Sequence, residues 1–262
     1  MIAETGLRLM ADPGFPPGVS RLDYVSSEDN TADWALAMPG RRDVWIVCLH
    51  GALSAGDQIF TRQDIRDLWL AHFLQSGCGV LSPNLRGDAW MCPEAASDLH
   101  ALLHWARGRY GASRFIFVTG SMGGSGSLIY ATLHPEDVAA VAALCAVTDI
   151  RAFHAEAGFL RDGIEKAYRG TPETAPERYR EHVVVEHAHR LRMPVFLCHG
   201  DADSMIPVRH SRALYALLKD REDVEYVEIP GGGHDAPLFE KKLPGWLDRQ
   251  LQNPQGRQGM RG

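Results

Sequence analysis

The segment Arg114–Pro135, RFIFVTGSMGGSGSLIYATLHP, constrains the fold of this chain more than any other segment. Residues 115–119 form a short run of aromatic and β-branched residues, which predicts a buried strand. The glycine-rich turn at 120–124 interrupts this run, and residues 125–133 then have helical spacing up to a proline. Ser121 therefore lies on a tight turn between a buried strand and a helix N-terminus, a strained and exposed position that suits a nucleophile.

Glycine-rich turns between a strand and a helix also bind phosphate groups, in dinucleotide-binding and P-loop proteins. The spacing here does not fit G-x-G-x-x-G, and no Gly-Lys-Ser/Thr follows, so neither phosphate motif is matched. A purely structural turn remains open from this segment alone. Residues elsewhere in the sequence are needed to decide whether this turn is structural or carries a nucleophile.

The composition is that of a globular protein and excludes several classes of partner. The chain has 262 residues, of which 45% are hydrophobic, enough for one large α/β domain or two small ones. Its formal net charge is −6 and it has no basic block, which argues against nucleic acid and anionic membranes as partners. No apolar run approaches the length of a membrane span.

The N-terminus and the cysteines favour a reduced, cytoplasmic protein. Residues 1–14 have no basic head followed by a long apolar segment, so a secretory signal is not expected. The five cysteines are odd in number and show no C-x-x-C pair or other metal spacing. Cys48, Cys145 and Cys198 lie inside apolar runs and are expected to be small core residues. The oligomeric state stays open.

Short apolar runs alternate with amphipathic segments along most of the chain. This alternation predicts the α/β class, with a mostly parallel, eight-stranded sheet covered by helices on both faces. The predicted strands are residues 21–26, 33–38, 44–49, 79–82, 115–119, 138–147, 194–198 and 224–229. The predicted helices are residues 65–74, 95–110, 125–133, 208–219 and 243–251. Residues 1–20 are expected to be irregular.

The domain organisation is predicted from the absence of a linker. No repeat or Pro/Gly/Ser-rich linker separates two halves, so residues 1–262 are expected to form a single domain. Residues 148–192 are polar, helix-forming pieces broken by glycine and proline, which predicts a short insert or cap over the sheet edge. The Gly/Gln/Arg-rich tail at 252–262 is expected to be disordered.

Three reactive side chains follow predicted strands, at the edge where open parallel sheets bind their ligands. Ser121 follows the strand at 115–119, Asp203 follows that at 194–198, and His234 follows that at 224–229. A serine needs a base within hydrogen-bond reach to become a nucleophile. A histidine is that base, and a carboxylate fixes its tautomer. The three residues together therefore predict nucleophilic catalysis.

At these residues the chain resembles an α/β-hydrolase, over about residues 21–251. The matching pieces are LHGAL, NLRGD, GSMGG, HGDADSMIP and GGGH. Within that superfamily the chain resembles the prolyl-oligopeptidase-like and dienelactone-hydrolase-like serine esterases. The pieces behind this resemblance are ATLHPEDVAAVAAL and PERYREHVVVEHAHRLRMPVFLCHGDAD. The resemblance implies the α/β-hydrolase fold and a catalytic triad of Ser121, Asp203 and His234.

The nucleophile turn departs from the family pattern at one position. The family has G-x-S-x-G, and Thr119 stands here in the place of the first glycine. Ser125 and Ser127 are rival nucleophiles, but both fall inside the predicted helix. Ser121 is therefore the predicted nucleophile.

The acid and the oxyanion hole rest on the resemblance. In similar proteins the acid stands three residues after the glycine of H-G-x-x-D, which selects Asp203 and leaves Asp201 as a residue that fixes the loop. The oxyanion needs backbone N–H donors, and the resemblance implies those of Met122 and Ala52. His50, just before that second loop, is expected to brace it.

Together these features predict a serine hydrolase that cleaves small to medium acyl esters through an acyl-enzyme. No cofactor or metal is implied. The insert is too short and polar for the lid of a long-chain lipase. Two alternatives remain open: a short-peptide serine peptidase of the prolyl-oligopeptidase-like type, and a non-catalytic α/β-hydrolase scaffold that binds a ligand or partner.

Overall fold

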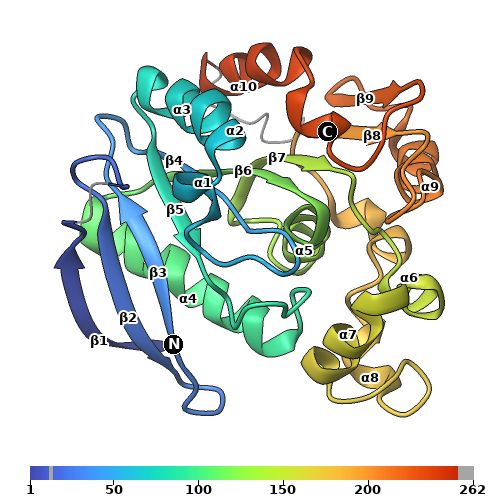
Figure 1. Ribbon diagram of the computed structural model, residues 1–262, viewed down its shortest axis with the longest axis horizontal. Coiled ribbons are helices and arrows are strands. Elements are labelled where there is room, and N and C mark those ends of the chain that lie inside the picture. Colours follow the sequence, from blue (N-terminus) through green and yellow to red (C-terminus); the bar gives the residue numbers. More distant parts are fainter. Residues whose placement is uncertain (12–13, 253–262) are drawn as a thin grey trace, which may run out of the picture.

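The computed structural model describes residues 1–11 and 14–252, and its framework is a nine-stranded mixed sheet (Figure 1). The strand order is β1-β2-β3-β5-β4-β6-β7-β8-β9. The strands up to β3 run antiparallel to their neighbours, and those from β5 to β9 are parallel. The bounds are β1 Ile2–Leu9, β2 Ser20–Ser26, β3 Ala32–Met38, β4 Val44–Val47, β5 Gly79–Pro83, β6 Arg114–Gly120, β7 Val138–Leu144, β8 Val195–Gly200 and β9 Val224–Ile229.

The predicted α/β class is confirmed, but the predicted strand count of eight is wrong. The missing strand is β1, in the part of the chain that was expected to be irregular. β1 forms the sheet edge and pairs antiparallel with β2, from Ile2 opposite Ser26 to Leu9 opposite Ser20. None of its eight residues is fully buried, so its sequence lacks the apolar run or clean alternation by which a strand is recognised.

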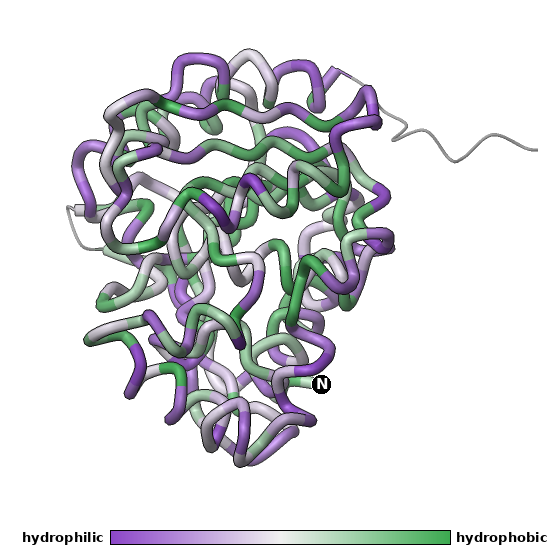
Figure 2. Tube along the Cα trace, turned by 90° about the vertical axis from the view of Figure 1, so that its right-hand side faces the viewer, coloured by the Kyte–Doolittle hydropathy of each residue, from purple (hydrophilic) through white to green (hydrophobic). Residues whose placement is uncertain are grey.

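Helices cover both faces of the sheet, and the side chains of each strand alternate between two hydrophobic clusters. On β6, Ile116 and Val118 face the cluster under α1–α3 and α10, whereas Phe115 and Phe117 face the cluster under α4, α5 and α9. Figure 2 shows the apolar strands in the interior and polar segments outside. The bounds are α1 Gln58–Thr61, α2 Gln63–Ile65, η1 Arg66–Leu70, α3 Ala71–Ser76, α4 Pro93–Tyr110, α5 Ser121–Leu133, α9 Arg209–Leu218 and α10 Lys242–Gln252.

Helix α5 begins four residues earlier than predicted. The sequence predicts a turn at residues 120–124 and a helix from Ser125, because glycines usually end or interrupt helices. In the structure Ser121 is the first residue of α5, and Gly123 and Gly124 lie inside its first turn. The nucleophile candidate is therefore part of the helix N-terminus rather than of a separate loop.

Residues 148–192 form a group of short helices beyond the end of β7 (Figure 1). Their apolar side chains, including those of Phe153, Ile164 and Tyr168, belong to the same hydrophobic cluster as α4 and α5. The insert and the sheet therefore share one hydrophobic cluster, and the single domain stays a prediction. The helical elements are α6 Ile150–Glu156, η2 Gly158–Leu160, α7 Arg161–Tyr168, α8 Pro176–Arg180, η3 Val184–Glu186 and η4 Ala188–Arg190.

Two further expectations concern the C-terminal tail and membrane-spanning helices. Gln252 is the last residue of α10, and the rest of the predicted tail at 252–262 lies outside the described residues. Within residues 1–11 and 14–252, no helix combines the length and the apolar composition needed to cross a bilayer.

Candidate active site

The turn between β6 and α5 presents Ser121 in a strained conformation. Ser121 has a φ of 57°, in the left-handed region that residues with a side chain rarely adopt. The two glycines that follow allow the close packing this turn needs. A Cβ on Gly123 would lie 2.2 Å from the carbonyl oxygen of Leu49, and one on Gly124 would lie 2.8 Å from that of Leu144. The start of α5 therefore packs directly against the backbone after β4 and at the end of β7.

The threonine that departs from the family pattern is buried and hydrogen-bonded at this turn. Thr119 is buried, and its hydroxyl donates to Ser127 Oγ at 2.8 Å. Ser127 Oγ in turn donates to the Gly124 carbonyl oxygen, and Ser125 Oγ donates to that of Ser121. Both rival serines are fully buried and use their hydroxyls to hold the turn. Only Ser121 is left facing the site.

The structure brings the three predicted triad side chains together in one hydrogen-bonded chain. His234 Nε2 lies 2.9 Å from Ser121 Oγ, and His234 Nδ1 lies 2.7 Å from Asp203 Oδ2. Ser121 follows β6, Asp203 follows β8 and His234 follows β9, all at the carboxyl edge of the parallel strands. The Asp203 side chain is fully buried and that of His234 is 16% exposed. A neutral imidazole whose Nδ1–H donates to Asp203 leaves Nε2 free to accept the Ser121 proton.

Asp203 is held as a carboxylate by donors on both oxygens. The N–H groups of Met205 and Ile206 donate to Oδ1 at 2.8 and 2.9 Å. Burial raises the pKa of Asp203, but the hydrogen bonds from His199, His234 and Ile206 outweigh burial and hold the pKa well below its ordinary value. The negative charge that an imidazolium at His234 needs is therefore permanent near neutral pH.

His199 is a site residue that the sequence analysis did not identify. Its buried ring places Nε2 3.3 Å from Asp203 Oδ2 and 2.8 Å from the Ile206 carbonyl oxygen, while Nδ1 lies 2.7 Å from Ser211 Oγ. His199 and Asp203 are four residues apart in the motif HGDAD. The only signal in the sequence for His199 is its place in this motif, beside the aspartates.

Asp201, the rival acid, makes a different contact. Its Oδ1 accepts the N–H of Gly231 at 2.6 Å, which ties the loop after β8 to the loop that carries His234. The two loops also meet through their backbones, because a Cβ on Gly200 would lie 2.1 Å from the Gly232 carbonyl oxygen. Asp201 thus fixes the distance between the loops of the acid and the base.

Two backbone N–H groups are available beside Ser121, at the residues predicted for an oxyanion hole. Met122 is the second residue of α5, so its N–H has no partner within the helix. Among the described residues, neither the Met122 nor the Ala52 N–H donates to a protein acceptor. His50 braces the second loop, with its ring nitrogens each 2.8 Å from a carbonyl oxygen, those of Gly51 and Asn84.

The Ala52 loop is also fixed by side chains on either side of that residue. The N–H of Gly51 donates to Gln58 Oε1 at 2.9 Å, and the N–H of Leu53 donates to Asp88 Oδ1 at 2.7 Å. The neighbours of Ala52 are therefore satisfied and immobilised while its own N–H stays available. Gln58 and Asp88 could not be predicted from the sequence, because nothing in their local sequence indicates which backbone they reach.

A cavity of about 260 Å³ opens beside Ser121 and His234. Its inner wall is mostly apolar and comes from the strand ends, from α1–η1 and from η5 (Ala236–Phe239). The main wall residues are Cys48, Ile59, Ile65, Trp69, Val118, Cys145 and Leu238. Phe159 and Leu160 of the insert complete the wall, so the insert borders the cavity. Burial raises the pKa of the Cys48 and Cys145 thiols, so neither competes with Ser121 as a nucleophile.

Comparison with known proteins adds the family. A model described as the prolyl oligopeptidase family (peptidase S9) matches residues 94–252, a span that contains Ser121, Asp203 and His234. The esterase LipC of Mycobacterium tuberculosis is 27% identical over 201 residues, which are 63% of this chain and 49% of that protein. The uncharacterized peptidase YtmA of Bacillus subtilis is 30% identical over 73 residues, 28% of each chain. The matches span half or less of these relatives.

Solved structures share the fold at low identity. The Pyrococcus furiosus esterase Pf2001 has a TM-score of 0.67 at 17% identity, over 89% of this chain and 91% of that one. The fluorophosphonate-binding serine hydrolase FphF of Staphylococcus aureus has a TM-score of 0.67 at 11% identity, over 90% and 98%. These likenesses show that the fold is the α/β-hydrolase fold.

Proposed function

Since this chain belongs to the prolyl oligopeptidase family, we propose that it is a serine hydrolase that cleaves carboxylic esters of small to medium acyl groups through an acyl-enzyme. The observation that carries the proposal is the hydrogen-bonded chain from Ser121 through His234 to Asp203. Relatives and structural neighbours that are named esterases support the ester bond as the substrate class.

Acylation begins at Ser121. His234 Nε2 accepts the Ser121 proton as Oγ attacks the ester carbonyl carbon, and Asp203 stabilises the imidazolium that forms. The carbonyl oxygen becomes an oxyanion, which accepts hydrogen bonds from the Ala52 and Met122 N–H groups. His234 then donates its proton to the leaving alcohol, and the acyl group stays on Ser121 as an ester.

Deacylation reverses the roles with water in place of the alcohol. His234, neutral again, accepts a proton from water as the water oxygen attacks the acyl carbonyl carbon. The same two N–H groups stabilise the second oxyanion. The Ser121–acyl bond breaks, Ser121 Oγ takes back the proton from His234, and the carboxylic acid leaves.

The size of the substrate is inferred from the cavity. Its volume of about 260 Å³ lies below the range of roughly 300–1,000 Å³ that is usual for drug-sized ligands. Its wall is mostly apolar, with Trp69 and Ile65 among the lining residues, which suits a hydrocarbon chain; the charged side chains of Arg62 and Asp235 also line it. Both features favour an acyl group of small to medium length over a long lipid chain.

Active-site labelling combined with a substrate series tests the proposal. The parent chain should take one fluorophosphonate adduct on the peptide that contains Ser121 and should cleave nitrophenyl esters from acetate to decanoate with a maximum below the long chains. Ser121→Ala should lose both properties. Ser204→Ala is the matched control, because Ser204 is exposed, directly follows Asp203 and has no bond to the triad.

The outcomes separate the alternatives. An adduct on Ser125 or Ser127 would show that the nucleophile is assigned to the wrong residue. Labelling at Ser121 together with cleavage of aminoacyl nitroanilides but not of esters would identify a short-peptide peptidase. A chain that neither labels nor cleaves either series would be a binding scaffold.

A further inference from the structure

A cluster of histidines lies at the C-terminal end of α5, away from the cavity. His100 and His104 lie on α4, and His134 is the C-cap residue of α5. The His100 ring is 4.5 Å from the His104 ring and 4.5 Å from the His134 ring, centroid to centroid. Asp137 follows in the turn that leads to β7, and its Oδ2 lies 2.8 Å from His100 Nδ1. The proposed hydrolysis uses none of these four residues.

The ligand-type atoms of this cluster lie close enough to share one ion. One such atom each of His100, His104 and Asp137 lies within 4.8 Å of the other two. The same holds for His134, Glu136 and Asp137, so two overlapping groups meet at the Asp137 carboxylate. In the described residues, every group of at least three such side chains within this distance contains Asp137.

The side chains have the chemistry that a zinc-class ion requires. Imidazole nitrogens and carboxylate oxygens bind Zn²⁺ at about 2.0–2.2 Å, which puts tetrahedral ligand atoms roughly 3.4 Å apart. His100 and His104 are separated by four residues on a helix, which places both rings on one face. The ligand atoms, up to 4.8 Å apart here, would have to move closer by about 1.4 Å to reach the tetrahedral spacing. Side chains of partly exposed histidines can make such a movement.

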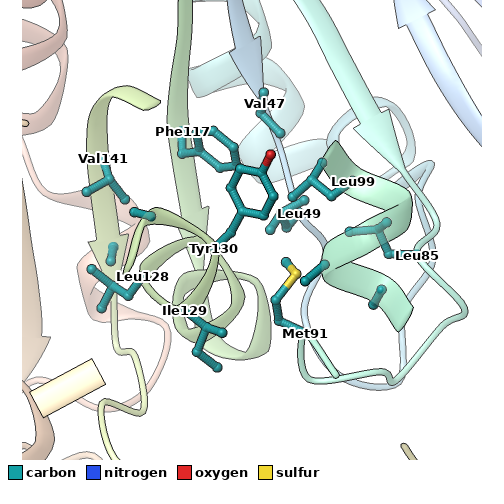
Figure 3. Close-up of a cluster of buried hydrophobic side chains, with 14 of the residues drawn as sticks. Val47, Leu49, Leu85, Met91, Leu99, Phe117, Leu128, Ile129, Tyr130 and Val141 are labelled. Atoms are coloured by element: carbon teal, nitrogen blue, oxygen red, sulfur yellow. The ribbon is translucent and has the colours of Figure 1, made fainter. Parts of the chain in front are cut away.

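Asp137 is held in place by donors that would remain when an ion binds. Its carboxylate is 5% exposed, Tyr130 Oη donates to Oδ2 at 2.6 Å, and Arg107 donates to Oδ1 at 2.8 Å. Figure 3 shows Tyr130 packed beside Phe117, with its hydroxyl directed away from helix α5. Metal ligands are commonly oriented by such outer hydrogen bonds.

We propose that His100, His104 and Asp137 bind one divalent transition-metal ion of the zinc class. The ion replaces the proton between His100 Nδ1 and Asp137 Oδ2, and that proton goes to solvent. The ion joins α4 to the turn after α5. α5 is 13 residues long, so the site lies about 20 Å from Ser121 along the helix axis. This proposal revises the expectation that no metal is implied, which followed from the predicted serine hydrolase.

Calorimetric titration with Zn²⁺ tests the site on the full chain without a histidine tag, after treatment with a chelator. The parent should bind one Zn²⁺ per chain, and His104→Ala should weaken that binding at least tenfold. Loss of a residue that hydrogen-bonds to a metal ligand already weakens metal binding by roughly 10–100-fold, and loss of a ligand itself should cost at least as much. Mg²⁺ should give no comparable binding, since it prefers oxygen ligands. His189→Ala is the control, because it removes an exposed imidazole elsewhere.

His104→Ala is the variant of choice because the His104 side chain is exposed and its loss leaves the core intact. Its ester hydrolysis should equal that of the parent, which separates this test from the proposed function. Zn²⁺ affinity equal to the parent's in His104→Ala would overturn the site. Weak binding of several ions, reduced equally by His189→Ala and His104→Ala, would show scattered surface histidines and overturn it too.

Discussion

Helix α5 has a histidine–aspartate pair near each end, and the two pairs have nearly the same geometry. Near the N-terminal end, His234 Nδ1 lies 2.7 Å from Asp203 Oδ2. Near the C-terminal end, His100 Nδ1 lies 2.8 Å from Asp137 Oδ2. Both carboxylates are buried, and further donors hold the pKa of each below its ordinary value although burial raises it. The pair alone therefore does not define a catalytic site.

The difference lies in what surrounds the histidine. His234 directs Nε2 at the Ser121 hydroxyl. The Ser121 backbone has a strained, positive φ, and its side chain faces a cavity with two available N–H groups beside it. The His100 ring instead packs between two more imidazoles, those of His104 and His134. A nucleophile with nearby N–H donors favours acyl transfer, and a group of imidazoles favours a metal ion.

The largest expected difference between the two pairs is in the rate. Asp203→Asn should lower kcat for a nitrophenyl ester by about 10⁴-fold, because the histidine takes the wrong tautomer when its carboxylate is lost. Asp137→Asn should leave kcat within about twofold, because Asp137 lies at the far end of α5. Steady-state kinetics on both purified variants measures the contrast.

The same pair of variants contains its own check on folding. Far-ultraviolet circular dichroism should give the same helix content for Asp203→Asn as for the parent, since an asparagine still accepts the N–H groups of Met205 and Ile206. An equal rate loss in both variants would mean that the two histidine–aspartate pairs do not differ in function as proposed.

A third histidine, His182, is hydrogen-bonded to a tyrosine instead of a carboxylate, and this difference should show in the pH dependence of stability. Burial lowers the pKa of His182 to about 4, and its Nδ1 lies 3.0 Å from Tyr168 Oη. Between pH 6.5 and 4 the unfolded chain binds a proton here and the folded chain does not. The free energy of unfolding should therefore fall as pH falls through this window, by on the order of 3 kcal/mol from this group.

Urea unfolding of His182→Gln at several pH values measures this contribution. The variant should be less stable than the parent at pH 7.5, and its stability should fall less between pH 6.5 and 4. His189→Gln, which changes an exposed histidine, should keep the parental slope. A parental slope in His182→Gln would mean that His182 is protonated in the folded chain or already neutral in the unfolded one.

The smallest expected effect concerns Asp201, the carboxylate that neighbours the triad without joining it. Asp201→Asn should lower kcat/KM less than tenfold, because the amide oxygen can still accept the Gly231 N–H. Asp201→Ala should lower it further, since the tie between the two loops is then lost. If Asp201→Asn lost as much as Asp203→Asn, the roles of the two aspartates would have to be exchanged.

The sheet could be predicted where burial leaves a pattern in the sequence. Residues 44–47 and 115–119 are covered on both faces, so they appear as continuous apolar runs. β1 could not be predicted in this way, because an edge strand with exposed side chains carries no such pattern. The first residue of α5 was also missed, because Gly123 and Gly124 are selected for close packing rather than for helix propensity.

The candidate site was predictable to the extent that it depends on strand ends. Ser121, Asp203 and His234 each follow a strand of one parallel sheet, so their proximity follows from the topology. The partners His199 and Gln58 could not be found in the same way, because their contacts depend on side-chain directions in folded loops. His100 and His104 did leave a signal, the spacing of four residues on a predicted helix.

The close approach of Gly123 to the Leu49 carbonyl oxygen also determines which substitutions the turn can accept. In a library that varies residues 119–127 one at a time, position 123 should retain only glycine among folded members, since a Cβ would lie 2.2 Å from backbone. Position 121 should accept glycine with a gain in stability, because glycine removes the strain of a positive φ, but with complete loss of turnover. Two positions of the same turn are thus constrained in opposite ways. The residue at position 123 is fixed by the need to fold, and the residue at position 121 is fixed by the need for a nucleophile, at a cost in stability.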